Sequence, residues 1–182
     1  MSERERASTS RGREPRVTAD EAVALGGLPL AVDLARVRLH RGGGGRAARA
    51  LRAVVLGLTG GRAIALGNHV FLPDGSHGSL PVLAHELTHC GQYQAWGPMR
   101  YYARGLADRL REIRHRRGLG PSPYEYAGGA PRPFSAYGME QQGQIVEDWV
   151  RGCPAAAACL MPPAADPPKE RTRSHRDPRS LP

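Results

Sequence analysis

Residues 80–90 read Leu-Pro-Val-Leu-Ala-His-Glu-Leu-Thr-His-Cys and carry the strongest structural signal in the chain. Ser79 stands where an N-cap residue is expected, and Pro81 suits the first helical turn, where its missing N–H costs nothing. The apolar side chains recur at steps of three and four, the period of a buried α-helix; they are Leu80, Leu83, Ala84, Leu87 and Cys90. The pattern predicts a helix with His-Glu-Leu-Thr-His at its centre.

This central pentad has the spacing of a metal site. Residues four apart lie on one face of a helix, so His85 and His89 would present two imidazoles to one zinc ion. Glu86 would stand beside them, placed to take a proton from a metal-activated water. The alternative is a pair of ordinary helix histidines with a solvated glutamate. Two histidines at this spacing, surrounded by aliphatic residues, favour the metal site, with Glu86 as the general base.

A catalytic zinc site needs a third protein ligand and one open position. Residues 139–151 are predicted to form a helix that turns Glu140, Gln144 and Glu147 to one side and its apolar residues to the other. Glu140 is the first choice for the third ligand because it begins the helix after a chain reversal. Glu147 is the second choice, and Asp148 is a candidate partner for a ligand histidine. A solvated acidic face is the alternative.

Four segments occur in an order typical of a known domain: residues 37–40, 47–55, 62–72 and 83–89. This order resembles the small bacterial zincin-like domain associated with extracellular contractile injection systems, whose members carry a His-Glu-Leu-Thr-His core. The resemblance covers about residues 36–95, and a weaker similarity extends to Trp149. Its most specific parts are the pentad and the strand-like run Ala-Ile-Ala-Leu-Gly-Asn of residues 63–68.

The resemblance implies a gluzincin-like, zinc-peptidase-type site that uses His85, Glu86 and His89, and it implies no particular substrate. Two departures stand out. Many relatives follow the pentad with an aliphatic residue and paired glutamines, whereas residues 90–94 read Cys-Gly-Gln-Tyr-Gln. The wider gluzincin class often carries an aspartate four residues after its third ligand, where this chain has Gln144.

The expected fold class is α+β: a compact zincin-like domain with a short sheet or hairpin packed on the motif helix and two further helices. Residues 17–153 form this domain. Residues 1–16 are rich in Ser, Glu and Arg, and residues 154–182 are rich in Pro, Ala and Arg, so both are expected to be disordered tails. A short helix near residue 18 would be capped by Thr18 or Asp20. Strands are expected at residues 37–39, 63–66 and 69–72.

Two further helices have predicted buried faces. Residues 47–56 would turn three side chains inward: Leu51, Val54 and Val55. Residues 100–117 would bury the stripe Tyr102, Leu106, Leu110 and Ile113, and their seven arginines against Asp108 and Glu112 supply about half of the net charge of +9. That basic face could attract an acidic partner. Solvation with local ion pairing is the favoured interpretation, and nucleic acid is not expected because no aromatic residues interleave with the charges.

The residues around the cleft suggest further roles. Asn68 and the residues after it are candidates for an edge strand with which a peptide substrate pairs through its backbone; a plain structural hairpin is the alternative. The Gly- and Pro-rich loop of residues 118–133 is placed to overhang the cleft. Tyr137 is the candidate catalytic hydroxyl that stabilises a developing oxyanion, with Tyr126 as the alternative, and simple packing as the other role for both.

Export and redox signals are weak. No apolar segment follows the first Met, and no stretch is long enough to span a membrane, which favours a cytoplasmic protein or one delivered outside the cell by an injection system. Three cysteines without a C-x-x-C pair indicate reduced thiols.

The sequence therefore favours a zinc-dependent metallopeptidase that acts on a peptide or protein substrate. The alternatives are a non-catalytic scaffold or interaction protein of an injection-type particle, and an exported peptidase toxin. A zinc ion with an exchangeable water in an open cleft would indicate the enzyme, whereas a closed shell of four protein ligands would indicate the scaffold.

Overall fold

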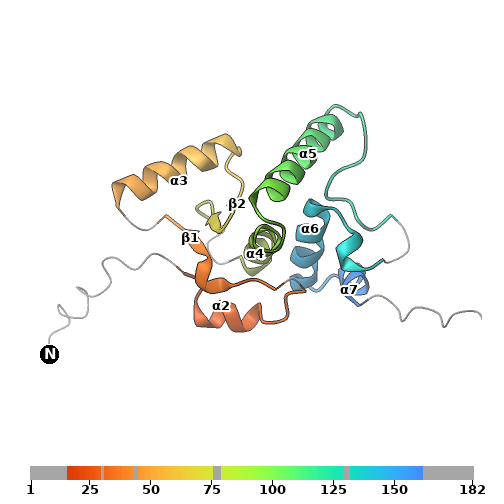
Figure 1. Ribbon diagram of the computed structural model, residues 1–182, viewed down its shortest axis with the longest axis horizontal. Coiled ribbons are helices and arrows are strands. Elements are labelled where there is room, and N and C mark those ends of the chain that lie inside the picture. The colour runs from red at the N-terminus through yellow and green to blue at the C-terminus, as the bar shows by residue number, and fades with distance from the viewer. Residues whose placement is uncertain (1–15, 30, 43–44, 76–78, 129–131, 162–182) are drawn as a thin grey trace, which may run out of the picture.

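The computed structural model describes residues 16–29, 31–42, 45–75, 79–128 and 132–161, and the expected α+β class is confirmed (Figure 1). Of the two expected tails, residues 1–16 and 154–182, the parts at residues 1–15 and 162–182 lie outside the described residues. No helix in the described part of the chain has the length and apolar character needed to cross a membrane. The elements are α2 (Ala19–Ala24), η1 (Leu34–Arg36), β1 (Arg38–His40), α3 (Arg46–Leu58), β2 (Ile64–Leu66), β3 (His69–Phe71), α4 (Leu80–Trp96), α5 (Pro98–Arg116), η2 (Phe134–Ala136), α6 (Met139–Val150) and α7 (Pro154–Leu160).

Helix α4 is the centre of the molecule, and Figure 1 shows it end-on between the strands and α6. Ser79 occupies the N-cap position and Pro81 lies in the first turn, as the sequence predicts. All side chains from Leu83 to Gln92 are buried, because strands β2 and β3 and helices α5 and α6 surround the helix. A helix enclosed on all sides carries its polar residues into the interior, where each needs a partner or a function.

The sheet has the order β1-β3-β2, with β1 parallel and β2 antiparallel to β3. Gly67 begins the tight turn between β2 and β3 with φ +64°, and a Cβ there would lie 3.2 Å from the ring of Tyr93. The expectation that Asn68 and the residues after it form a free edge is wrong, because β3 is paired on both sides. The edge strand beside α4 is β2, and the Asn68 side chain accepts a hydrogen bond from Gln94 at 2.8 Å.

Two groups of buried apolar side chains hold the elements together. The larger lies between the sheet and helices α4 and α6, and includes Val37, Leu39, Val70, Leu72, Leu87 and Val146. The smaller joins α6 to α7, and consists of Tyr137, Ile145, Ala156 and Cys159. Both groups use α6, so this helix is fixed on two sides against the rest of the fold.

Helix α3 faces inward less than predicted, because of the three expected side chains only Val55 is partly buried. Leu51 is 51% and Val54 62% exposed, and only Leu56 of this helix is buried. A polar contact also ties α3 to the residue after β3, since Arg52 Nε donates to the Leu72 carbonyl at 2.9 Å. The helix therefore leaves an apolar face open.

Helix α5 is also turned the other way from the prediction. Its expected buried stripe is exposed, with Leu106 at 63% and Leu110 at 55%. The buried side chains are Tyr101, whose hydroxyl donates to the Ala65 carbonyl at 2.8 Å, and the acidic pair Asp108 and Glu112. Polar contacts with neighbouring elements thus outweigh the apolar stripe in orienting the helix.

The C-terminal tail was expected to begin at Pro154, but Pro154–Leu160 forms helix α7 instead. Pro154 suits a helix start and the alanines after it have the highest helix propensity of any residue. Ala156 and Cys159 are buried against α6, since small side chains permit a close approach. Cys90, Cys153 and Cys159 are all free thiols.

Candidate metal centre

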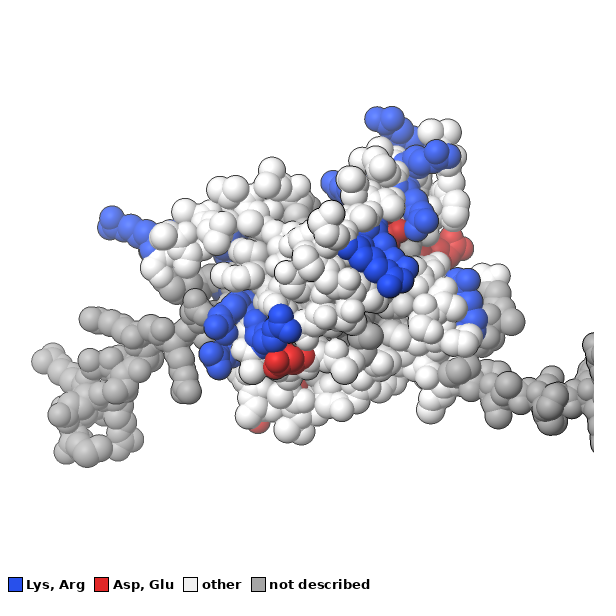
Figure 2. All heavy atoms as spheres, viewed as in Figure 1, with Lys and Arg blue, Asp and Glu red and all other residues white. Residues whose placement is uncertain are grey.

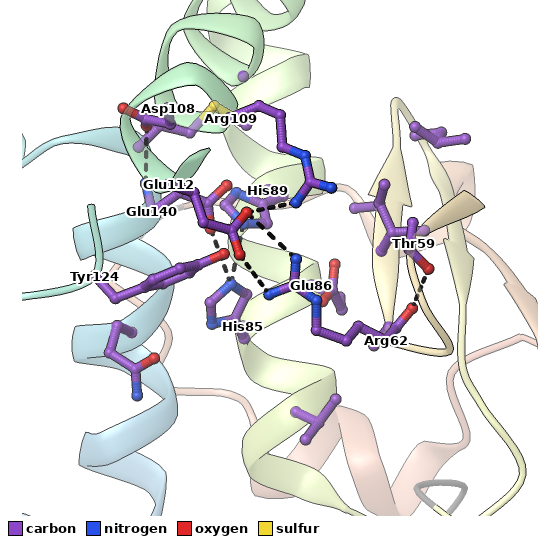
Figure 3. A pocket seen from close by; sticks show the side chains of 18 of the residues that line it. Thr59, Arg62, His85, Glu86, His89, Asp108, Arg109, Glu112, Tyr124 and Glu140 are labelled. Carbon is purple, nitrogen blue, oxygen red and sulfur yellow. Dashed lines mark hydrogen bonds and ion pairs between the residues drawn. The ribbon is translucent and has the colours of Figure 1, made fainter. Parts of the chain in front are cut away.

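Three ligand atoms from two helices converge in the interior: Nε2 of His85, Nε2 of His89 and Oε2 of Glu140 (Figure 3). The two nitrogens lie 3.1 Å apart, and the carboxylate oxygen lies 3.6 Å from the first and 3.5 Å from the second. Donors held about 2.0–2.2 Å from a tetrahedral zinc ion would lie about 3.3–3.6 Å from one another. The residues therefore fit a zinc ion in both type and spacing.

The Nδ1 atom of each of these histidines forms a hydrogen bond with an acceptor. His85 Nδ1 lies 2.9 Å from Glu147 Oε2, and His89 Nδ1 lies 2.8 Å from Gln92 Oε1. The Gln92 amide is oriented by its own donation to the Met139 carbonyl at 3.1 Å. Because both partners accept, each ring in its neutral form carries hydrogen on Nδ1 and offers the lone pair of Nε2 to a metal.

The three acidic residues of α6 make different contacts. The structure brings Glu140 to the two Nε2 atoms, and it puts Glu147 on the opposite side of the His85 ring, where it orients the imidazole. Asp148 does not contact a ligand histidine as proposed from the sequence. It accepts hydrogen bonds from Tyr126 at 2.8 Å and Gln144 at 3.0 Å instead.

Glu86 is the unusual residue of the site. Its side chain is buried, it lines the cavity above the ligand atoms, and its Oε2 has no hydrogen-bond partner among the described residues. Burial raises the pKa of this carboxyl group, against the opposing effect of His85 and His89. A buried carboxylate with an open lone pair and a raised pKa is suited to accept a proton near neutral pH.

The same charges control the protonation of the ligands in the metal-free protein. Burial by itself would lower the pKa of His85, but its hydrogen bonds with the carboxylates of Glu140 and Glu147 raise the pKa to about 10. Burial would raise the pKa of Glu140, but the two histidines hold it well below its usual range. At neutral pH the metal-free site therefore holds at least one proton more than two neutral imidazoles carry, and this proton makes His85 an imidazolium.

Zinc binding is expected to release this proton, since the ligand must be neutral imidazole. The apparent zinc affinity should rise about tenfold per pH unit between about pH 6 and 8, because the pKa of His85 lies above this range in the folded protein. Calorimetric titration with zinc in two buffers that differ in ionisation enthalpy measures the number of protons released. Equal binding enthalpies in the two buffers would contradict this protonation state.

The ligand atoms lie at the floor of a cavity of about 820 Å³. One wall is the edge strand β2 and the end of α3, and the other is α5; the residues that line these walls include Leu58, Arg62, Ile64, Leu66, Tyr102, Leu106 and Arg109. The size and the mixture of apolar walls with convergent polar groups are those of a ligand-binding cleft. The histidines, Glu86 and Glu140 are therefore accessible from the surface through this cavity.

Tyr124 lines the cleft on the side of the His85 ring. Tyr137 is buried in the smaller core with its hydroxyl 3.2 Å from Cys159 Sγ, so it cannot serve the site as proposed, and Tyr126 is bound to Asp148. Tyr124 comes from the predicted overhanging loop, and its ring centre lies 6.5 Å from that of His85. Burial, with Glu140 and Glu112, raises the pKa of Tyr124 to about 12, so its hydroxyl remains a donor.

Gly143 on α6 lets the two helices approach at the site. A Cβ at this position would lie 2.8 Å from His85 Nε2 and 2.9 Å from its Cε1. Only a glycine fits here without moving the imidazole. The sequence offered no signal for this role, because a glycine within a helical pattern gives no indication of what faces it.

Residues 29–97 match the model of the eCIS core domain, less than half of the chain. The match links the chain to extracellular contractile injection systems. The matched segment runs through β1, α3, β2, β3 and α4, and so contains both histidines and Glu86, whereas Glu140 on α6 lies beyond it. Neither a curated protein nor a solved structure gives a significant match.

Proposed function

We propose that this chain is a zinc-dependent peptide hydrolase with a zincin-like site. The observation that carries the proposal is the buried Glu86 carboxylate, whose Oε2 is unpartnered among the described residues and which adjoins the tripod of His85, His89 and Glu140. An oriented general base beside a three-ligand metal site with an open cleft is the arrangement that hydrolysis requires.

A zinc ion held by the tripod would supply Lewis acidity and lower the pKa of a water toward neutrality. Glu86 would accept the proton of that water and pass it to the leaving nitrogen of the peptide bond. Glu147 and Gln92 hold the imidazole rings in the orientation that the tripod needs. Tyr124, rather than Tyr137, donates its hydroxyl to the developing oxyanion.

The edge strand β2 offers a place for an extended peptide. Residues Ile64–Leu66 line the cavity and one side of the strand is paired with β3, while the Ala65 carbonyl already accepts a hydrogen bond from Tyr101. A peptide that pairs with this edge gains affinity from main-chain hydrogen bonds without demanding a sequence. The scissile bond would then pass over the floor of the cleft, where His85 and Glu86 lie.

A second candidate function is a scaffold or interaction protein of an injection-type particle. The match of residues 29–97 favours it, because it points to association with such particles rather than to a reaction. The exposed apolar faces of α3 and α5 also suit a protein contact. In that case the cleft would serve as a binding surface, and any bound metal would stabilise the fold.

Metal analysis together with peptide cleavage separates the two candidates. We expect one zinc per purified chain, cleavage of members of a random peptide library, loss of cleavage when a chelator removes the zinc, and recovery when zinc is added back. Zinc-loaded protein that cleaves no member of the library would contradict the hydrolase proposal. A chain that retains no zinc would contradict the metal site itself.

A further inference from the structure

Three arginine side chains share a single carboxylate beside the candidate site. Arg62 NH1 lies 3.0 Å from Glu112, Arg109 NH1 lies 2.5 Å from it and Arg116 NH2 lies 2.6 Å from it. These hydrogen bonds lower the pKa of Glu112 although burial would raise it, so the group is a carboxylate at neutral pH. The cluster therefore carries an excess of two positive charges.

Two of these three guanidinium groups face the cleft. Arg62 and Arg109 line the cavity that has His85 and Glu86 at its floor, and their side chains are 48% and 47% exposed. Figure 3 shows both guanidinium groups on the same side of the Glu112 carboxylate, with dashed lines to its oxygens. Arg116 shares the same carboxylate but does not line the cavity. The excess charge is thus presented to whatever enters the cleft.

Of the acidic groups that line the cavity besides Glu112, three are engaged by other side chains, and Glu86 is buried at the floor beside the histidines. Glu140 and Glu147 contact the histidines at the floor, and Asp108 is paired with Arg111 at 2.6 Å. Arg62 and Arg109 are left sharing one carboxylate with a third arginine, and a guanidinium has five N–H donors in a fork that matches a carboxylate. The available partner for the cluster is an anion on the ligand.

Large apolar side chains also line both walls of the cavity beside these arginines. Four exposed or partly exposed side chains line the same cavity: Leu58, Leu66, Tyr102 and Leu106. On the face shown in Figure 2, basic side chains gather along α5, whereas the surface over α3 carries few charges. An apolar surface continuous with a pocket marks a binding site. A ligand that fits this cavity needs large apolar side chains as well as a negative charge.

We infer that the cleft selects polypeptide segments in which a carboxylate lies beside large apolar side chains. Arg62 and Arg109 bind the carboxylate, and Leu66, Tyr102 and Leu106 contact the apolar side chains. An acidic side chain and a free C-terminus offer the same chemistry to the arginines. The inference rests on the proposed peptide hydrolysis for its reaction, but the binding step does not require cleavage.

The test measures peptide binding to the full chain carrying Glu86→Gln, with zinc added, so that no substrate is consumed. The probes are fluorescent, leucine-rich octapeptides with Glu, Gln or Lys at one internal position and an amidated C-terminus, and the Gln peptide with a free C-terminus. We expect a carboxylate to strengthen binding about tenfold over the amidated Gln peptide, as a charge-assisted hydrogen bond does. Comparison of the Glu peptide with the free-acid peptide shows whether the cleft binds a side-chain carboxylate or a C-terminal one. If neither binds more tightly than the amidated Gln peptide, the inference is overturned.

Matched variants locate the effect. Arg62→Gln and Arg109→Gln should each remove most of the preference, and Arg62→Lys should keep part of it. Arg116→Gln removes the same charge from the same carboxylate outside the cavity, so it should retain the preference. If Arg116→Gln lost the carboxylate preference to the same extent, the preference would come from the overall positive charge of α5, and the proposed subsite would be overturned. Circular dichroism and thermal unfolding of each variant establish that it is folded.

Parallel cleavage by the wild-type chain separates this inference from the proposed function. If the wild type cleaves no peptide while the Glu86→Gln protein still prefers a carboxylate, the hydrolase proposal fails and the subsite stands. If the wild type cleaves the amidated Glu, Gln and Lys peptides at equal rates, the subsite fails and the hydrolase stands.

Discussion

The Glu86→Gln protein is expected to bind zinc as the wild type does and to lose peptide cleavage by a factor of about 10² to 10⁴, the contribution of a general base. Glutamine has nearly the same volume and can occupy the buried position, but it cannot accept the proton of the attacking water. The measurements are the zinc content of the purified protein and kcat/KM for a peptide that the wild type cleaves.

Glu140→Gln is the matched control, because it makes the same chemical change one helix away. Glu140 lies against both Nε2 atoms, so this variant should lose zinc affinity together with cleavage. The two variants thus separate the base from the ligand. Cleavage by Glu86→Gln at the wild-type rate would exclude the assigned role of Glu86.

Gly143→Ala is expected to weaken zinc binding by at least about tenfold, the scale of disturbing an orienting contact at a metal site, while the protein stays folded. The added Cβ would lie 2.8 Å from His85 Nε2, so the imidazole must move away from His89 and Glu140. The hydrogen bond of His85 with Glu147 resists this movement. Zinc affinity by competition with a chromogenic chelator measures the loss.

Gly57→Ala provides the control for the helical effect of the same substitution. Gly57 is also within a helix, and a Cβ there would meet no atom within 4 Å. Alanine in place of a helical glycine stabilises a helix by about 1 kcal/mol. Gly57→Ala should therefore raise the unfolding temperature slightly and leave zinc affinity unchanged. Wild-type zinc affinity in Gly143→Ala would show that the ring can shift without cost.

The parts of the fold that the sequence predicts well depend on local spacing. The apolar period around the pentad placed α4, and the polar and apolar faces of residues 139–151 placed α6 with Glu140 turned toward the histidines. The turn at Gly67-Asn68 placed the β2–β3 hairpin. The residues that determine each of these features lie within one turn or on one helical face, so the features can be predicted without knowing which distant segments are in contact.

The features that the sequence did not predict depend on contacts between distant segments. The apolar stripe of α5 shows which side of the helix is apolar, but the hydrogen bond of Tyr101 with Ala65 and the cluster around Glu112 decide which side is buried. Tyr124 and Arg62 reach the cleft from segments that have no motif of their own. Their positions follow only from the way the chain folds back on α4.

The coordination set is divided between two remote parts of the chain, His85 and His89 on α4 and Glu140 on α6, some fifty residues later. An ion bound there would cross-link the two helices without a covalent bond. By mass action, zinc at one hundred times its dissociation constant would add about 2.7 kcal/mol to the stability of the docked state. Metal supply in the surroundings would then govern how firmly the C-terminal helices stay attached, as well as whether the site can react.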